Sequence, residues 1–86
     1  MENEQTEKRI AVVGIIISDR SAVVSVNAAL SDFGEFILGR LGLPIRERGI
    51  NAISVVLDAP APTINALTGR LGAIKNVSAK ALFEKY

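Results

Sequence analysis

The feature that most constrains this chain is a short apolar run, residues 10–17, in which six of the eight residues are Ile or Val. Branching at Cβ favours the extended backbone of a strand over a helix. The run is far shorter than the roughly 20 residues that span a membrane. Because both alternating faces of residues 9–17 are apolar, we predict a central strand that is covered on both faces.

A helix is predicted to follow this strand. Residues 18–21 carry polar and charged side chains that favour turns and helix caps. Beyond them an apolar stripe recurs at spacings of four, four and three, formed by Ala22, Val26, Leu30 and Phe33. This spacing predicts a helix over residues 21–33, closed by Gly34 at the position just beyond its end.

Two strands joined by a charged turn are predicted next, over residues 35–43 and 50–58. Residues 44–49 between them begin with Pro and end with Gly, which is typical of a turn. Gly39 and Gly42 interrupt the first of these strands and indicate a bulge or a close backbone approach.

The last part of the chain is predicted to form a helix and a strand. Two prolines in residues 60–63 are tolerated in the first turn of a helix, and this helix is expected to end near Gly72. Residues 77–84 alternate as a final strand. Gly69, inside the helix, costs about 1 kcal/mol relative to Ala, so we predict that it packs closely against another backbone.

The order β-α-β-β-α-β defines an α+β, ferredoxin-like fold, with a four-stranded antiparallel sheet and two helices on one face. The 86 residues allow one domain, which we place at residues 9–86. Residues 1–8 are polar and lack the apolar segment of a secretory signal. We therefore predict a flexible N-terminal tail and a cytoplasmic location.

The composition predicts self-association. A domain of this size buries only about 60–65% of its unfolded surface, yet 49% of the residues are apolar. The sheet face opposite the helices is expected to carry apolar side chains that need a cover. We predict a homo-oligomer, a dimer or a tetramer, whose interface contains Phe36, Leu38, Val56 and Leu82.

The chain contains no cysteine and no histidine. Disulfides, thiol catalysis and cysteine-ligated metals are therefore excluded, and the commonest general base and metal ligand is missing. A net charge of +1 provides no field that would attract nucleic acid or a membrane. We expect no catalytic residues, no metal and no cofactor, and we do not expect an enzyme or a membrane protein.

Asp19, Arg20 and Ser21 leave two interpretations open. At the start of a helix, backbone N–H groups favour an anion, and Arg20 could bind a carboxylate with both of its terminal nitrogens. The alternative, which the residue types favour, is that Ser18 or Asp19 simply caps the helix.

Arg40, Arg46 and Arg48 form a second charged group, around the predicted turn. One interpretation is a ribbon that contacts nucleic acid. The other is a solvated turn that also protects the sheet edge. The intervening Glu47 and the low net charge favour the solvated turn.

Three stretches, residues 13–20, 37–49 and 67–72, resemble the iron-only hydrogenase system regulators, a family of short ACT-like proteins of Thermotoga type. The resemblance covers nearly all of the chain after the predicted tail. It implies a fold akin to ACT domains and to the C-terminal domain of the nickel-responsive repressors. Those domains dimerise or tetramerise and bind small effectors at subunit interfaces.

In ACT domains the loop after the first strand commonly has the sequence Asp-Arg-Pro-Gly. Asp19 and Arg20 match its first two positions, whereas Ser21 and Ala22 replace the Pro and the Gly. The metal site of the nickel repressors does not carry over, because their His and Cys ligands have no counterpart here.

The resemblance and the residues together predict a cytoplasmic regulatory module of an iron-only hydrogenase system, a homo-oligomer that binds a small effector near Asp19, Arg20 and Ser21. Any control of transcription is then indirect, through a protein partner. Two alternatives remain. One is an interaction module with no small ligand, whose open sheet face docks on a protein partner. The other is a regulator that binds DNA directly through the arginines around the turn.

Overall fold

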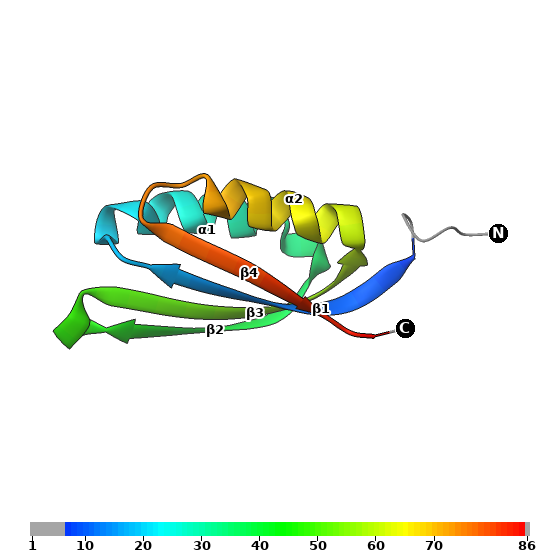
Figure 1. The fold of residues 1–86 in the computed structure, drawn as a ribbon, viewed down its shortest axis with the longest axis horizontal. Helices are drawn as coiled ribbons and strands as arrows, with labels where there is room; N and C mark the ends of the chain where they lie inside the picture. Colours follow the sequence, from blue (N-terminus) through cyan, green and yellow to red (C-terminus); the bar gives the residue numbers. More distant parts are fainter. Residues whose placement is uncertain (1–6, 86) are drawn as a thin grey trace.

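Four antiparallel strands form one sheet, with two helices on one of its faces, in the computed structural model, which describes residues 7–85 (Figure 1). This arrangement confirms the predicted ferredoxin-like fold. The strands lie in the order β2-β3-β1-β4. The elements are β1 (Lys8–Ile17), α1 (Val23–Asp32), β2 (Ile37–Ile45), β3 (Ile50–Pro60), α2 (Ala61–Gly72) and β4 (Val77–Phe83).

The apolar run of the sequence forms β1, which lies in the middle of the sheet. It pairs with β3 from Lys8 opposite Pro60 to Ile17 opposite Asn51, and with β4 along most of its other edge. On one face of β1 the side chains are buried, whereas on the other Ile16 is 43% exposed. Within residues 7–85 both helices lie on the same side, so the chain itself covers one face of β1, and the cover predicted for the other face is left to another molecule.

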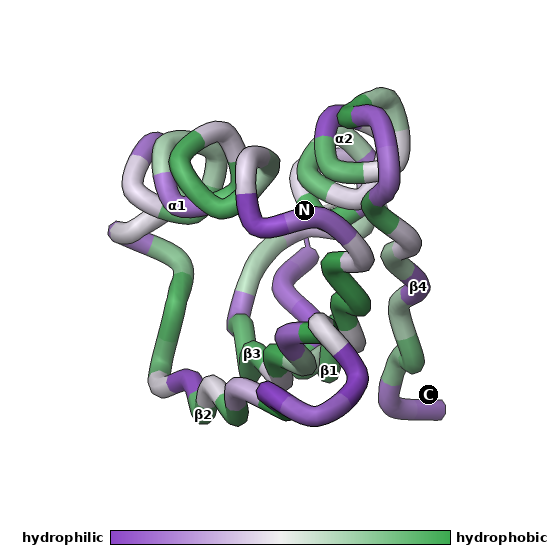
Figure 2. The backbone as a smooth tube through the Cα atoms, turned by 90° about the vertical axis from the view of Figure 1, so that its left-hand side faces the viewer, coloured by the Kyte–Doolittle hydropathy of each residue, from purple (hydrophilic) through white to green (hydrophobic). Residues whose placement is uncertain are grey.

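The core fills the space between the sheet and the two helices. Figure 2 shows both helices above one face and no element below the other. Each helix buries an apolar stripe at helical spacing against this face of the sheet, as the sequence predicts. The helix residues in this core are Val26, Ala29 and Leu30 of α1 and Ile64, Leu67 and Leu71 of α2.

The end of α1 differs from the prediction. The helix ends at Asp32, and the N–H of Phe33 donates to the carbonyls of Ala29 and Leu30 at 3.3 and 3.2 Å. Gly34 then begins a 3-10 turn, Gly34–Phe36. It does not adopt the left-handed conformation of a closing glycine, since Gly49 is the only glycine with positive φ among the described residues. The predicted role of Gly34 is therefore wrong.

β2 contains the irregularity that the sequence predicts. The register shifts between Ile37 and Gly39, which confirms a bulge in this strand. The strand continues to Ile45, and a 3-10 turn, Arg46–Arg48, leads into Gly49 at φ 64°. A left-handed backbone of this kind is readily adopted by glycine and costly for most other residues.

Gly69 does not have the packing role that the sequence suggested. A Cβ atom built on it meets nothing within 4 Å, so no other backbone of the described chain approaches it. The prediction of close packing is wrong for residues 7–85, and this glycine weakens α2 with no compensating contact there.

The predicted N-terminal tail falls mostly on residues 1–6, which lie outside the described residues. Lys8 already belongs to β1, where it pairs with Pro60. At the same end of the sheet, the N–H of Glu84 donates to the carbonyl of Ile10 at 2.9 Å. Over residues 7–85, the helices are all too short to cross a bilayer.

Candidate functional site

The sheet face away from the helices carries most of the exposed large apolar side chains of the described residues, and we call it the open face. The register arranges the side chains of its middle part in three rows across all four strands, in the order β2, β3, β1, β4. Beyond these rows the face continues with Ile10 opposite Asp58 at one end and with Ile45 opposite Ile50 at the other. The valine row is Gly39, Val56, Val12 and Leu82; the glycine row is Leu41, Ser54, Gly14 and Lys80; the isoleucine row is Leu43, Ala52, Ile16 and Ser78.

Large apolar side chains on this face are exposed. Leu41 is 63% exposed and Leu82 is 72% exposed, although both belong to strands of the sheet. A monomeric soluble protein rarely exposes a contiguous apolar patch larger than a few hundred Å², and such patches usually mark interaction surfaces. The exposure follows directly from the sequence, because β1 is apolar on both faces and the helices cover one.

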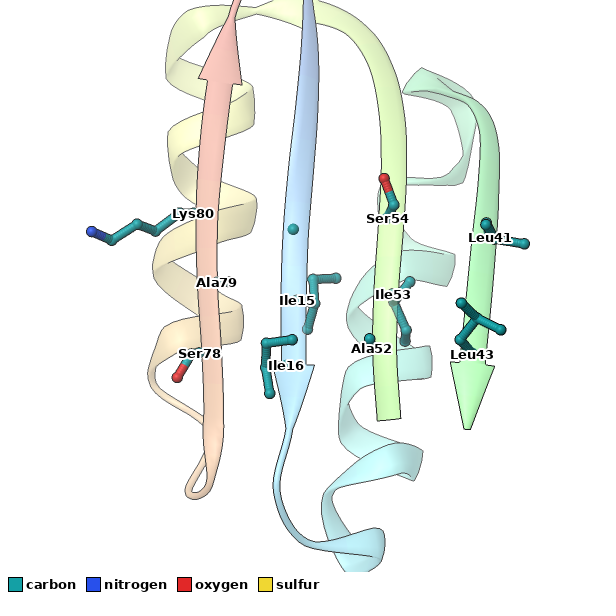
Figure 3. A pocket seen from close by; sticks show the side chains of 11 residues that line it. Ile15, Ile16, Leu41, Leu43, Ala52, Ile53, Ser54, Ser78, Ala79 and Lys80 are labelled. Carbon is teal, nitrogen blue, oxygen red and sulfur yellow. The ribbon is translucent and has the colours of Figure 1, made fainter. Parts of the chain in front are cut away.

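A hollow of about 460 Å³ lies between the side chains of the glycine and isoleucine rows. Figure 3 shows Ile16 and Leu43 standing beside it, with Ala52 between their strands. Gly14 contributes no side chain, so the middle of the sheet is low at this point. Lys80, the one charged residue of the three rows, extends from the edge strand away from the rest of the sheet (Figure 3).

The structure places the four predicted interface residues differently from one another. Val56 and Leu82 belong to the valine row. Leu38, 65% exposed, is the residue passed over at the bulge. Phe36 lies in the 3-10 turn before β2 and packs against the core, not on the open face. The bulge explains this difference, because it breaks the simple alternation that put Phe36 and Leu38 on the same face.

The loop after β1 holds the predicted effector residues. The carboxylate of Asp19 accepts the backbone N–H of Ser21 at 3.0 Å and the side-chain amide of Asn76 at 3.5 Å. The hydrogen bond from Ser21 holds the pKa of Asp19 below its ordinary value of 3.8, and the charge of Lys75 acts in the same direction. Asp19 therefore caps the turn Arg20–Ala22, as the simpler interpretation predicts.

This turn separates Arg20 from its neighbours. Asp19 and Ser21 line a shallow hollow of about 340 Å³ next to Asn76. Arg20 lines a different hollow of about 480 Å³, between the loop and the turn that joins β2 to β3. The second hollow is also lined by Pro44, Ile45, Arg46, Gly49, Ile50 and Asn51.

Arg46 also lines the hollow of Arg20, although it was not among the residues predicted for the effector site. It brings a second guanidinium to the hollow of Arg20, and no acidic residue lines it. The signal in the sequence was the charged turn between Pro44 and Gly49. Nothing in the sequence indicated that this turn lies beside the loop after β1.

The arginines that the less favoured interpretation assigned to a nucleic-acid ribbon do not lie together. Arg40 donates to the side-chain oxygen of Asn27 on α1 at 3.3 Å, which directs it to the helix side of the sheet. Arg46 lines the loop hollow, and Arg48 belongs to the same turn but not to the hollow. Over residues 7–85, Asp and Glu side chains form no group of three that could hold a metal ion.

Comparison with known protein families gives a match along most of the chain. Residues 9–81 match the TM1266-like family, described as "Iron-only hydrogenase system regulator, putative". The solved structure of the uncharacterised protein TM1266 from Thermotoga maritima is 41% identical, with a TM-score of 0.89. The match covers 92% of this chain and 100% of that one.

More distant structures share the fold alone. The C-terminal domain of the MgtC protein from Mycobacterium tuberculosis is 14% identical, with a TM-score of 0.70, over 100% of this chain and 96% of that one. A formyltetrahydrofolate deformylase from Pseudomonas putida is 15% identical, with a TM-score of 0.62, over 85% of this chain and 28% of that one. No curated protein sequence matches the chain.

Proposed function

The chain belongs to the TM1266-like family of iron-only hydrogenase system regulators, and from that premise we propose that it is a cytoplasmic, non-catalytic module that works by association. It forms a homo-oligomer through its open face and binds a small effector bearing a carboxylate beside Arg20. It acts on the hydrogenase system through a protein partner. The observation that carries the proposal is the uncovered apolar face, because a regulator without catalytic groups must act through what it binds.

The hollow between the loop and the β2–β3 turn supports the effector part of the proposal. The Arg20 guanidinium has no hydrogen-bond or ion-pair partner within residues 7–85, so it is available to a ligand. Arg46 and Asn51 line the same hollow and add a second cation and an amide. Two guanidinium groups with no acid beside them favour a carboxylate, which each can bind with two hydrogen bonds.

Asp19 and Ser21 have a different part in this proposal. Because the Asp19 carboxylate is already bonded to the Ser21 N–H, it stabilises the loop that carries Arg20. We therefore assign ligand contact to Arg20 and support of the loop to Asp19 and Ser21.

The test is a thermal-unfolding screen of the purified protein against amino acids and other small carboxylates. A ligand at 100 times its dissociation constant adds about 2.7 kcal/mol of stability, which raises Tm by roughly 10–20 °C in a domain of this size. The Arg20→Ala and Arg46→Ala variants lose the shift. Arg48→Ala is the matched control, since Arg48 belongs to the same turn but does not line the hollow.

Two results would argue against the effector. If no compound shifts Tm, the chain is an interaction module without a small ligand. If a shift survives in the Arg20→Ala variant, the ligand binds elsewhere.

A further inference from the structure

We infer that the open face is covered by the same face of a second copy. The two copies are related by a two-fold axis that lies between the two sheets, parallel to the strands and above the gap between β1 and β3. The inference rests on the homo-oligomer of the proposed function and specifies its geometry. In this arrangement β1 of one subunit faces β3 of the partner, β2 faces β4, and each row faces itself.

The size of the face suits such a pair. Four strands about 4.8 Å apart, and three rows about 6.7 Å apart along them, give a plan area of roughly 390 Å². Side chains that project from the sheet add accessible surface to this area. The total is then comparable with the roughly 800 Å² per partner that a stable interface buries.

The charge of the face also favours a second copy. Lys80, at the edge, is the one charged residue of the three rows, and Asp58, opposite Ile10, lies beyond the valine row at the end of the face. A charged partner would lose its hydration against such a surface without gaining an opposite charge. A second apolar face has no such cost, and both subunits remove Leu41 and Leu82 from water at once.

The sizes of the side chains select the axis. When each row faces itself, Ile16 lies over Ala52 of the partner subunit. At the outer strands, Leu43 lies over Ser78 of the partner subunit, and Leu82 lies over Gly39 of the partner subunit. Large side chains meet small ones in each of these pairs, which close packing requires.

The alternative axis, across the strands through the glycine row, is less favourable. It places each strand over its own counterpart, so that Leu41 meets Leu41 of the partner subunit and Lys80 meets Lys80 of the partner subunit. Like charges that face each other are destabilising. With the axis along the strands, Lys80 instead lies over Leu41 of the partner subunit, where its aliphatic stem packs while its ammonium group reaches water.

Sheet twist preserves the central pair. Aligned sheets pack about 10 Å apart with their strands rotated by about 30°. The central strands lie about 2.4 Å from the axis, so this rotation moves Ile16 relative to Ala52 of the partner subunit by only about 1 Å. The outer strands lie about 7 Å from the axis, where the shift is about 4 Å, roughly half the row spacing. Leu43 then lies between Ser78 of the partner subunit and the next open-face position of that strand, still within reach of a short cross-linker.

Cysteine cross-linking tests the arrangement directly, because the natural chain contains no cysteine. In the Leu43→Cys/Ser78→Cys double variant, the two positions lie on opposite edge strands of one chain, too far apart to join to each other. With the axis along the strands, they lie opposite each other between subunits, and a short bis-maleimide joins the subunits into a covalent dimer. The Gly39→Cys/Leu43→Cys variant is the matched comparison and gives no dimer.

Sedimentation equilibrium of the whole chain provides the second measurement. Leu41→Lys puts a second ammonium group beside Lys80 of the partner subunit and weakens the dimer by at least about a hundredfold. Val24→Lys is the control, because Val24 is 78% exposed but belongs to α1, on the other side of the molecule. Circular dichroism verifies that both variants are folded.

Each outcome decides the inference. A covalent dimer from the Gly39→Cys/Leu43→Cys variant instead of the Leu43→Cys/Ser78→Cys variant would overturn the axis. A chain that is monomeric at high concentration, or a dimer that Leu41→Lys leaves intact, would overturn the second copy as the occupant. No ligand is needed in these assays, so they can fail while the effector screen succeeds, and the reverse.

Discussion

Replacing Gly69 with Ala should stabilise the protein, although the residue lies in a stretch that resembles the hydrogenase-regulator family. Gly69 lies inside α2, and an added Cβ meets nothing within 4 Å. The substitution therefore removes the backbone entropy cost of glycine and creates no clash. We expect a gain of about 0.5–1 kcal/mol.

Urea unfolding followed by far-UV circular dichroism measures this gain. For a domain of this size, the urea midpoint should rise by about 0.5–1 M. Thermal unfolding of the same variant should show a rise in Tm of roughly 3–8 °C. Ala66→Gly is the matched control, since Ala66 is an exposed residue of the same helix. It should lose about as much stability as Gly69→Ala gains.

A fall in stability would refute the reasoning, because it would show that something occupies the space beside Gly69. The dependence on protein concentration identifies the cause. A fall that grows with concentration indicates a neighbouring subunit packed against α2, whereas a fall that is independent of concentration indicates a contact of Gly69 within its own chain.

Three further outcomes are expected. Gly49→Ala should cost about 1–2 kcal/mol in urea unfolding, because Gly49 has φ 64°. Asp19 has a pKa below 3.8 in the folded state, so its ionised carboxylate adds stability that is fully present above the unfolded pKa. The free energy of unfolding of the natural chain should exceed that of Asp19→Ala by a constant amount from neutral pH to about pH 5. This difference should shrink as the pH falls through the folded pKa, and an unchanged difference at pH 2 would contradict the reasoning. The ion pair between Arg70 and Asp32 joins side chains that are 44% and 63% exposed at 2.6 Å, so a double-mutant cycle should give less than about 1 kcal/mol, and high salt should abolish it.

The element order could be predicted from the sequence because each element carries its own period. The two helices repeat their apolar residues at three and four, and the branched residues of β1 and β3 require a sheet. The identity of what covers the second face of β1 could not be predicted from one chain. An apolar face indicates that it needs a cover, but it does not identify the cover as a helix or as another molecule.

Errors at single residues arose where the chain departs from regular periods. Phe36 lies in a 3-10 turn and Leu38 at a bulge, so neither follows the alternation of β2. Gly34 is consistent in sequence with a helix-closing residue, but Phe33 ends α1 through its own hydrogen bonds. The residue inserted at the bulge and the residues of the 3-10 turn shift the regular period, and a local apolar pattern does not reveal such a shift.

At the candidate effector site, prediction from the sequence failed for a different reason. Asp19 and Arg20 are neighbours in sequence, yet they line different hollows. A tight turn directs consecutive side chains to different sides, and Arg46 approaches only because β2 and β3 project their turn toward the loop. Such proximity depends on tertiary structure, which the spacing of residues does not encode.

The central position of β1 has a consequence for the order in which the protein folds. β1 is made first, but its partners β3 and β4 follow it by roughly 30 and 60 residues. At a synthesis rate of about 5–20 residues per second, the most apolar segment waits roughly 2–6 s for its first neighbour. Once β3 has been made, the hairpin of β2 and β3 can form from local contacts, and β1 can then pair along its free edge. Lys8 and Arg9, directly before the run, place two positive charges beside a segment that would otherwise pair readily with the same segment of another nascent chain.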